Sequence, residues 1–243
     1  MKCVLILGAS SDIAKAAARQ YAQEGCTILL AGRRAEALEA FSKDLIIRYK
    51  VSARYVAFDA ADPTSHALFY HTLSPSPDIV ICAFGELGDQ ERAEEDWASC
   101  NRIIQANYTG AVSILNIVAN DMAARRSGTI VGISSVAGDR GRQSNYIYGS
   151  AKAGFTAYLS GLRNRLFKSG VHVVTVKPGF VNTKMTSGLK LPGPLTAQPV
   201  QVATAIRKAV RKKTNVIYVL WMWRWIMLII RSVPEGIFKK LKL

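Results

Sequence analysis

Residues 3–14 read Cys-Val-Leu-Ile-Leu-Gly-Ala-Ser-Ser-Asp-Ile-Ala, and this stretch decides the fold. Its five leading apolar residues predict a short buried strand, and a turn into a helix follows at once. Gly8 permits a tight turn, and the small Ala9 and Ser10 keep side chains away from anything that approaches the backbone. A helix that begins near Asp12 leaves its first amides unpaired, which favours a phosphate group there. An ordinary strand-turn-helix unit without a ligand fits the same letters.

Strand patterns and helix patterns alternate along the rest of the chain. Apolar runs that predict further strands occupy residues 27–32, 53–58, 78–81, 128–135, 171–177 and the segment that begins at 216. Strands that alternate with helices are typical of a parallel sheet covered on both faces. At 243 residues the chain can form one substantial core. The sequence therefore predicts an α/β fold with one Rossmann-type, doubly wound parallel sheet of about seven strands.

Tyr148 and Lys152 lie four residues apart in the predicted helix 144–167, so their side chains share one face. A free phenol has a pKa of about 10, and a neighbouring ammonium favours the phenolate and lowers that pKa. Ser135 ends the strand run 128–135, whose carboxyl end is expected to face a ligand crevice. The Ser135 hydroxyl would then hold a substrate oxygen beside Tyr148. Together the three residues predict a site that gives a proton to a carbonyl oxygen.

The second predicted strand, residues 27–32, is followed by Arg33 and Arg34. A chain that binds NAD usually carries a carboxylate here, which bonds the ribose hydroxyls. A guanidinium instead suits a 2′-phosphate, through charge-assisted and often forked hydrogen bonds. The pair therefore favours NADPH or NADP over NAD. Solvated charges that cap a loop are the alternative interpretation.

These motifs resemble those of the short-chain dehydrogenase/reductase family over nearly the whole chain. The family's Gly-x-x-x-Gly-x-Gly loop is matched at Gly8, although Asp12 and Ala14 replace its other two glycines. Asp12 must then point its carboxylate away from phosphate, and Ala14 must tolerate close helix packing. The family's Asn-Asn-Ala-Gly motif is replaced by Cys82-Ala-Phe-Gly85, which leaves Gly85 as the expected backbone contact to the cofactor. The resemblance implies cofactor-binding positions at Gly8, Ser10, Ser11, Asp12, Ile13, Arg33, Arg34, Asp59, Ala60, Ala83, Phe84, Gly85, Tyr148, Lys152, Pro178, Gly179, Val181 and Thr183.

The resemblance also implies roles for single residues. Asn107 would hold a water in a proton relay behind Lys152, and Lys152 would also orient the nicotinamide ribose. Asp59 would contact the adenine. A polar residue that stabilises a helix bend fits Asn107 equally, and a turn or N-cap residue fits Asp59. The expected catalytic residues are Ser135, Tyr148, Lys152 and Asn107.

Some family members reduce a 2-keto-pentose carried on a polyprenyl phosphate, and this chain resembles them at residues 83–89, 107–109, 148–154 and 231–238. The Ala-Phe-Gly variant in the first of these segments and the tail in the last are less general than the catalytic residues. The resemblance implies NADPH-dependent reduction of a lipid-linked keto-sugar in cell-envelope synthesis. One alternative is reduction of another lipid-like ketone, such as a 3-oxoacyl or sphingoid compound. A second is a non-catalytic, cofactor-binding membrane scaffold. The altered glycine loop and the lost asparagines leave room for a scaffold, whereas the intact catalytic residues argue against it.

The net charge of +15 is concentrated near the C-terminus. Basic residues crowd the segment 190–242, where Glu235 is the only acid. Within it, residues 221–232 are apolar around most of a helix, with Arg224 and Arg231 on one face. Such a helix suits a membrane interface, with tryptophans at headgroup depth and arginines on anionic lipid. Docking on a neighbouring subunit of a homo-dimer or tetramer is the alternative. No nucleic-acid partner is expected, because no recognition motif accompanies the charge.

The sequence predicts a catalytic domain over residues 1–220 and a hydrophobic, basic tail over residues 221–243. Within the domain, residues 178–199 are dense in proline, glycine and threonine and are expected to form a lid over a carbonyl substrate. Residues 1–7 are too brief for a signal peptide, and the four cysteines show no metal spacing, which predicts reduced thiols and no metal site. The expected location is the cytoplasm, with contact to the inner face of the membrane through the tail.

Overall fold

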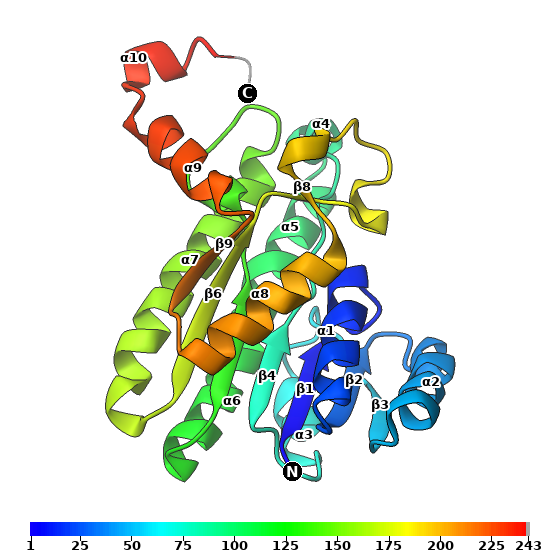
Figure 1. Ribbon diagram of the computed structural model, residues 1–243. Coiled ribbons are helices and arrows are strands. Elements are labelled where there is room, and N and C mark those ends of the chain that lie inside the picture. Colours follow the sequence, from blue (N-terminus) through cyan, green and yellow to red (C-terminus); the bar gives the residue numbers. More distant parts are fainter. Residues whose placement is uncertain (242–243) are drawn as a thin grey trace.

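A computed structural model describes residues 1–241 and has one central sheet with helices on both faces (Figure 1). Seven parallel strands form this sheet in the order β3-β2-β1-β4-β5-β6-β9. Their bounds are β1 Cys3–Leu7, β2 Thr27–Gly32, β3 Ala53–Ala57, β4 Ile79–Cys82, β5 Thr129–Ile133, β6 His172–Pro178 and β9 Val216–Val219. The predicted doubly wound α/β fold is confirmed. Lys242 and Leu243, the last residues of the predicted tail, lie outside the described residues.

Each face of the sheet is covered by its own set of helices (Figure 1). One face carries α1 Asp12–Gln23, α2 Glu39–Tyr49 and α8 Pro199–Lys212. The other carries α3 His66–His71, α6 Gly110–Arg125 and α7 Tyr146–Leu166. Two shorter helices, α4 Gln90–Glu95 and α5 Trp97–Ile104, precede α6. Both layers are needed because the strands of a parallel sheet are apolar on both sides.

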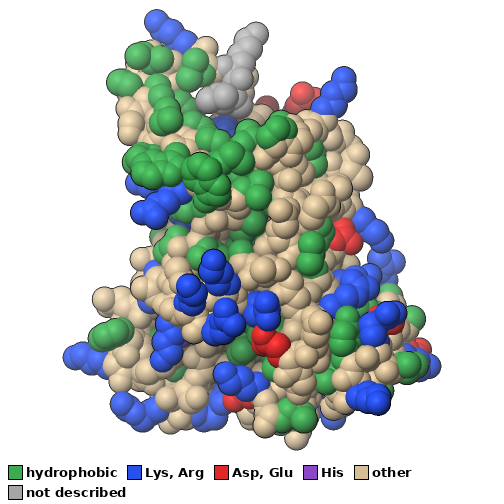
Figure 2. All heavy atoms as spheres, viewed as in Figure 1, with side chains coloured by type: hydrophobic (Ala, Val, Ile, Leu, Met, Phe, Trp, Pro, Cys, Tyr) green, Lys and Arg blue, Asp and Glu red, His purple; other side chains and the backbone are tan. Residues whose placement is uncertain are grey.

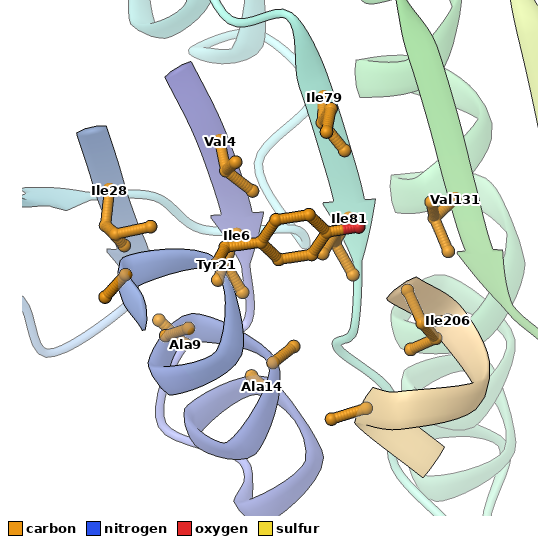
Figure 3. Packing of buried hydrophobic residues seen from close by; sticks show 14 of the residues in the cluster. Val4, Ile6, Ala9, Ala14, Tyr21, Ile28, Ile79, Ile81, Val131 and Ile206 are labelled. Carbon is orange, nitrogen blue, oxygen red and sulfur yellow. The ribbon is translucent and has the colours of Figure 1, made fainter. Parts of the chain in front are cut away.

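The strands divide their side chains between two cores. Val4 and Ile6 of β1 belong to the core under α1 and α8, whereas Leu5 and Leu7 belong to the core under α6 and α7. All four side chains are fully buried. Figure 3 shows the first core, where the ring of Tyr21 from α1 lies among strand residues. Burial on both faces fixes how the strands are aligned along the sheet. It therefore also fixes the edge at which the strands end.

The strand order reverses beside β1. The chain runs outward from β1 to β2 and β3, then returns to place β4 on the other side of β1. The loops after β1 and β4 therefore leave the same edge of the sheet in different directions. Such a switch point is where open α/β sheets form their ligand crevice.

The predicted lid contains a small sheet of its own. β7 Phe180–Val181 pairs with β8 Thr196–Ala197 in parallel. Two single turns of 3₁₀-helix, Lys184–Thr186 and Gly193–Leu195, lie between them. The lid therefore has a folded base beside the end of β6, and its tip carries the exposed Met185 and Leu189.

The tail continues from β9 into α9 Met222–Ser232 and α10 Glu235–Phe238. Trp223 and Met227 on one face of α9 are buried against the body of the protein. Exposed apolar side chains occupy its other face, among them Trp225, Leu228 and Ile229. Within residues 1–241 we find no helix with the length and apolar character needed to span a bilayer.

Candidate active site

Two adjoining hollows open at the carboxyl ends of β1, β4 and β5. The first has a volume of about 500 Å³ and lies beside the ends of β1 and β2. The second has a volume of about 320 Å³ and lies over the end of β5. Both are lined by Ser10, Ser11, Ala83, Phe84, Gly85 and Met185. The shared lining makes them two parts of one cleft at the switch point.

Nearly all the site residues predicted from the sequence line this cleft. The first hollow adds Gly8, Arg33, Asp59 and Ala60 to the shared residues. The second adds Asp12, Ile13, Asn107, Ser135, Tyr148, Lys152, Pro178, Gly179, Val181 and Thr183. Arg34 lines neither hollow, although it is exposed like its neighbour Arg33. The end of β2 therefore places Arg33 at the cleft and Arg34 outside it, although the sequence predicts the same role for both arginines.

Gly8 forms the tight turn that the sequence predicts after β1. Its φ of +82° lies in the region that favours glycine, and its amide donates to the carbonyl of Ala31 at 2.9 Å. A β-carbon at this position would lie 2.6 Å from the backbone nitrogen of Phe84. The ends of β1 and β4 thus approach too closely for any side chain at position 8.

The first turn of α1 lies at the cleft. Ser11 is its N-cap, and the hydroxyl accepts a hydrogen bond from the amide of Ala14 at 3.2 Å. The amides of Asp12 and Ile13 come before the first intrahelical bonds, so they are available to a ligand. Ala14 is fully buried and tolerates the close helix packing that the family's glycine usually meets.

The Asp12 carboxylate contacts the predicted lid segment. Its Oδ2 accepts a hydrogen bond from the amide of Lys184 at 2.9 Å. Lys184 begins the 3₁₀ turn that follows Thr183 in the lid. This contact gives the carboxylate a partner other than phosphate, as the sequence requires, and it links the fingerprint turn to the segment 178–199.

Lys152 lies deep under the end of β5. Its Nζ donates a hydrogen bond to the carbonyl of Ile133 at 3.1 Å and lies 5.7 Å from the centre of the Tyr148 ring. The Ser135 hydroxyl accepts a hydrogen bond from the amide of Ala137 at 3.1 Å, which orients it at the cleft wall. The predicted helix and strand end therefore bring the three catalytic candidates into one hollow.

Burial controls the protonation of this site. It raises the pKa of Tyr148 to about 12, and a hydrogen bond with Ser135 opposes this with a smaller lowering. Burial also lowers the pKa of Lys152 to about 8. The expected lowering of the Tyr148 pKa by Lys152 is therefore wrong for the protein without a cofactor. Loss of hydration penalises both charged forms, and the ammonium is bonded to Ile133 rather than to the phenol.

Asn107 lies in the π-helical turn Gln105–Thr109 between α5 and α6. Its Nδ2 donates to the carbonyls of Ile103 at 2.8 Å and Glu86 at 2.6 Å, and its Oδ1 accepts from the amide of Glu86 at 3.3 Å. A β-carbon on Gly85 would lie 2.6 Å from Asn107 Oδ1 and 3.3 Å from Lys152 Nζ. Asn107 thus stabilises the helix bend and also borders Lys152, so both sequence interpretations fit the same position.

Asp59 caps the turn after β3. Its Oδ1 accepts a hydrogen bond from the amide of Ala61 at 2.9 Å, which agrees with the turn interpretation. The residue also lines the first hollow beside Arg33. A structural role and a position for ligand contact are therefore compatible here.

Sequence reasoning missed several polar or aromatic residues of the second hollow, among them Arg142, Asn145 and Trp223. Trp223 comes from α9, is 4% exposed, and donates from its indole Nε1 to the carbonyl of Leu195 in the lid at 3.1 Å. Other large apolar side chains surround Trp223 in the sequence, so nothing in the pattern marks it as the one that reaches the hollow. Arg142 and Asn145 lie in a polar loop, and no sequence motif in this loop marks them as site residues.

The residues present fit a dinucleotide. The cleft joins a glycine turn, free amides of α1 and the basic side chain of Arg33, while Gly85 keeps the wall beside Lys152 free of side chain. In residues 1–241 no group of three or more His, Cys, Asp or Glu side chains is placed to hold a metal ion.

Comparison with known proteins agrees with this geometry. The family model for short chain dehydrogenases matches residues 2–191. An uncharacterized oxidoreductase of Mycobacterium tuberculosis is 35% identical over 241 residues, which cover 98% of this chain and 96% of the relative. An uncharacterized oxidoreductase of Streptomyces coelicolor is 36% identical over 246 residues, which cover 99% of this chain and 96% of the relative. The structure of a Sphingobium yanoikuyae short-chain dehydrogenase in complex with NADPH covers 97% of this chain and 98% of its own, with a TM-score of 0.82 at 22% identity. The chain belongs to the short-chain dehydrogenase family of oxidoreductases.

Proposed function

We propose that this protein is an NADPH-dependent reductase of a ketone. The observation that carries the proposal is the convergence of Ser135, Tyr148 and Lys152 in a hollow that adjoins the glycine turn and Arg33. A cofactor-binding scaffold without turnover would have no need for a buried lysine beside a phenol. The family relatives named above are oxidoreductases, which supports the same conclusion.

NADPH is the proposed cofactor. Arg33 pairs with its 2′-phosphate, and the first amides of α1 hold its pyrophosphate. The Sphingobium structure with the same fold contains NADPH. Bound NADPH supplies a hydride, and so two electrons, to the carbonyl carbon of the substrate and becomes NADP⁺.

Tyr148 gives its phenolic proton to the carbonyl oxygen, which completes a secondary alcohol. Ser135 holds that oxygen by donating a hydrogen bond, and Lys152 orients the nicotinamide ribose. A water beside Asn107 restores the proton through Lys152. The pKa of about 12 for Tyr148 keeps the phenol protonated at neutral pH, which is the form that reduction needs.

Oxidation of NADPH with a panel of ketones tests the proposal. Tyr148→Phe should lower kcat by about 100- to 10,000-fold, the usual contribution of a general acid, while NADPH binding stays intact. Tyr158→Phe is the matched control, because Tyr158 lies on the same helix and its hydroxyl donates to Asn116 at 2.9 Å outside the hollow. Full activity in the Tyr148 variant, or no ketone reduced by the unaltered protein, would reject the catalytic role and favour the scaffold.

The proposed substrate is a keto-sugar on a polyprenyl phosphate, as for decaprenylphosphoryl-2-keto-β-D-erythro-pentose reductase, which this chain resembles in Ala83-Phe84-Gly85 and residues 231–238. The second hollow combines polar groups at its base with apolar walls from Met185, Leu189 and Trp223. Such a lining suits a polar head on an apolar chain. A 3-oxoacyl or sphingoid ketone is the alternative, and its reduction at a higher kcat/KM than the keto-sugar would establish it.

We further propose that the tail contacts the membrane. Figure 2 shows hydrophobic side chains gathered over α9 with basic side chains beside them. The exposed apolar residues are Trp221, Trp225, Leu228, Ile229, Ile237 and Leu241, and the neighbouring basic residues are Arg224, Arg231, Lys239 and Lys240. Apolar side chains within a basic surround suit an interface of anionic lipid. A cytoplasmic protein would then meet its lipid-linked substrate at the inner face of the membrane.

Sedimentation with lipid vesicles tests this contact. The protein should bind vesicles that contain phosphatidylglycerol and bind phosphatidylcholine vesicles weakly, and Leu228→Ser with Ile229→Ser should abolish binding. Absence of binding, together with a homo-dimer that the same double variant dissociates, would instead assign the surface to a second subunit. A dimer or tetramer that persists in the double variant is compatible with the membrane proposal.

A further inference from the structure

The loop at residues 139–145 connects Ser135 to Tyr148 and supplies two polar residues to the substrate side of the cleft. Arg142 and Asn145 line the second hollow together with both catalytic side chains. Neither belongs to the first hollow, where Gly8 and Arg33 lie. The loop therefore borders the space left for substrate, apart from the fingerprint turn.

This loop is anchored to the body of the protein by its first two residues. The Asp139 carboxylate accepts hydrogen bonds from Lys177 Nζ and from the hydroxyl of Tyr218, the latter at 2.8 Å. Arg140 Nη1 donates to the carbonyls of Ile230 and Val233, each at 2.6 Å. Both charged side chains are thus engaged in holding the loop. Arg142 is the third charged residue of the loop, and it has no comparable partner.

The Arg142 side chain is partly buried, and its guanidinium is poorly paired. Its Nε is inaccessible to water and has no hydrogen-bond partner, and its one hydrogen bond is a long one of 3.4 Å from Nη2 to the carbonyl of Val136. No carboxylate of residues 1–241 forms an ion pair with it. Burial lowers the pKa of Arg142, although a guanidinium stays charged in proteins. Arg142 is thus a partly desolvated charge that feels the Asp139 carboxylate but forms no ion pair with a described residue, so the group is suited to an anion that arrives with the substrate.

Asn145 is also left with an unused group. It is the N-cap residue of α7, a position where the side chain usually accepts a hydrogen bond from the helix amides. Here Gln90 Oε1 accepts from the amide of Ile147 at 3.2 Å instead, and no cap bond reaches Asn145. The Oδ1 atom of Asn145 is buried without a donor among the described residues. Because Asn145 lines the second hollow, a ligand hydroxyl bound there would supply the missing donor.

We propose that Arg142 and Asn145 select a ketone that carries both an anionic group and a hydroxyl, that is, a phosphorylated keto-sugar. Arg142 pairs with phosphate oxygens, and Asn145 accepts from a sugar hydroxyl. The proposal rests on the proposed ketone reductase activity and narrows its substrate. A simple 3-oxoacyl chain offers no hydroxyl donor, and a sphingoid ketone places an ammonium group near Arg142, which repels it.

Three five-carbon ketones test the proposal with NADPH: D-ribulose 5-phosphate, D-ribulose and 2-pentanone. The unaltered protein should show the highest kcat/KM with ribulose 5-phosphate. Arg142→Gln should raise KM for that compound by about 10- to 100-fold with little change in kcat, since a charge-assisted bond is lost. The same variant should leave KM for 2-pentanone unchanged. Asn145→Ala should lower kcat/KM for both sugars and leave kcat/KM for 2-pentanone unchanged.

Two controls keep the outcome clear. Arg142→Lys restores the charge without the forked geometry and should recover part of the loss; it also serves if Arg142→Gln does not fold. Arg102→Gln removes an arginine from the first hollow and should not change the preference among ketones. Calorimetric titration of the NADP⁺-loaded protein with ribulose 5-phosphate gives a readout without turnover.

Equal binding of ribulose 5-phosphate by the unaltered protein and Arg142→Gln would overturn the proposal. So would no detectable binding by either, or an equal loss with all three ketones. If 2-pentanone is reduced normally while phosphate gives no advantage, only this inference fails. If no ketone is reduced and Tyr148→Phe behaves like the unaltered protein, the proposed reductase activity fails as well.

Discussion

The indole ring of Trp223 lies directly against Gly179, so that any β-carbon at position 179 would overlap the ring. Phe180 meets the same indole edge-on, with ring centres 5.6 Å apart. The first turn of α9 therefore forms a wall of the second hollow. Gly179 and Trp223 meet there although they lie more than 40 residues apart in the sequence.

Trp223→Ala should lower the free energy of unfolding by about 3 to 5 kcal/mol, because a large buried side chain leaves a cavity. It should also raise KM for the ketone, since the lid loses the hydrogen bond to Leu195. Trp225→Ala is the control: that side chain is 56% exposed on the same helix and should change stability by less than about 0.5 kcal/mol. Urea denaturation without lipid measures the stability of both variants, and steady-state kinetics measure their KM. Equal changes of stability and of KM in the two variants would show that the tail does not shape the site.

Gly8→Ala and Gly25→Ala separate backbone strain from a clash at the cleft. Both glycines have a positive φ, +82° and +78°, so either alanine should cost about 1 to 2 kcal/mol in the free energy of unfolding. Only the β-carbon at position 8 meets the backbone of Phe84, whereas position 25 faces open space. Gly8→Ala should therefore cost more and weaken NADPH binding, which denaturation and fluorescence titration measure. Similar results for the two variants would argue against close approach at position 8.

Arg33→Ser should raise KM for NADPH by about 10- to 100-fold and leave KM for NADH unchanged, because only NADPH carries the 2′-phosphate. Arg34→Ser should have less than about a threefold effect, since its side chain lies outside both hollows. Steady-state kinetics with the two cofactors provide the measurement. A larger effect at position 34 would show that the arginines exchange roles when the cofactor binds.

Lys152→Met should stabilise the protein without cofactor at pH 7. Folding lowers the pKa of Lys152 from 10.5 to about 8, so the unfolded chain binds more protons between these values. The stability of the unaltered protein should therefore rise from about pH 8 to pH 10.5, as the buried ammonium loses its proton. The gain from Lys152→Met is up to about 3 kcal/mol at pH 7 and should shrink over that range.

Thermal melts from pH 7 to pH 10 check this prediction. Lys168→Met provides the control, because Lys168 lies exposed near the end of the same chain segment and its replacement removes a lysine from the surface rather than from the interior. A gain for Lys152→Met that is constant with pH would mean that packing, rather than the buried charge, accounts for the change.

The sequence alone was sufficient for much of the fold. Residues 3–7 are apolar at every position because a central parallel strand is buried on both faces, and β1 covers those same residues. The four-residue spacing of Tyr148 and Lys152 needs only a regular helix, which α7 provides. Such features depend on residues that are close in the sequence, so the local sequence predicts them.

Tertiary structure decided what depends on contacts between distant segments. Arg33 and Arg34 are adjacent in sequence, but the end of β2 places only the first in the cleft. Trp223 reaches the hollow because α9 packs beside the lid, and Asn145 is free because Gln90 of α4 caps α7 in its place. The pKa of Tyr148 rises because surrounding layers exclude water, and no pair of sequence letters reports that exclusion. Desolvation and packing are properties of the assembled sheet and its helices, and they determine the chemistry of a site for which the sequence had named most, but not all, of the residues.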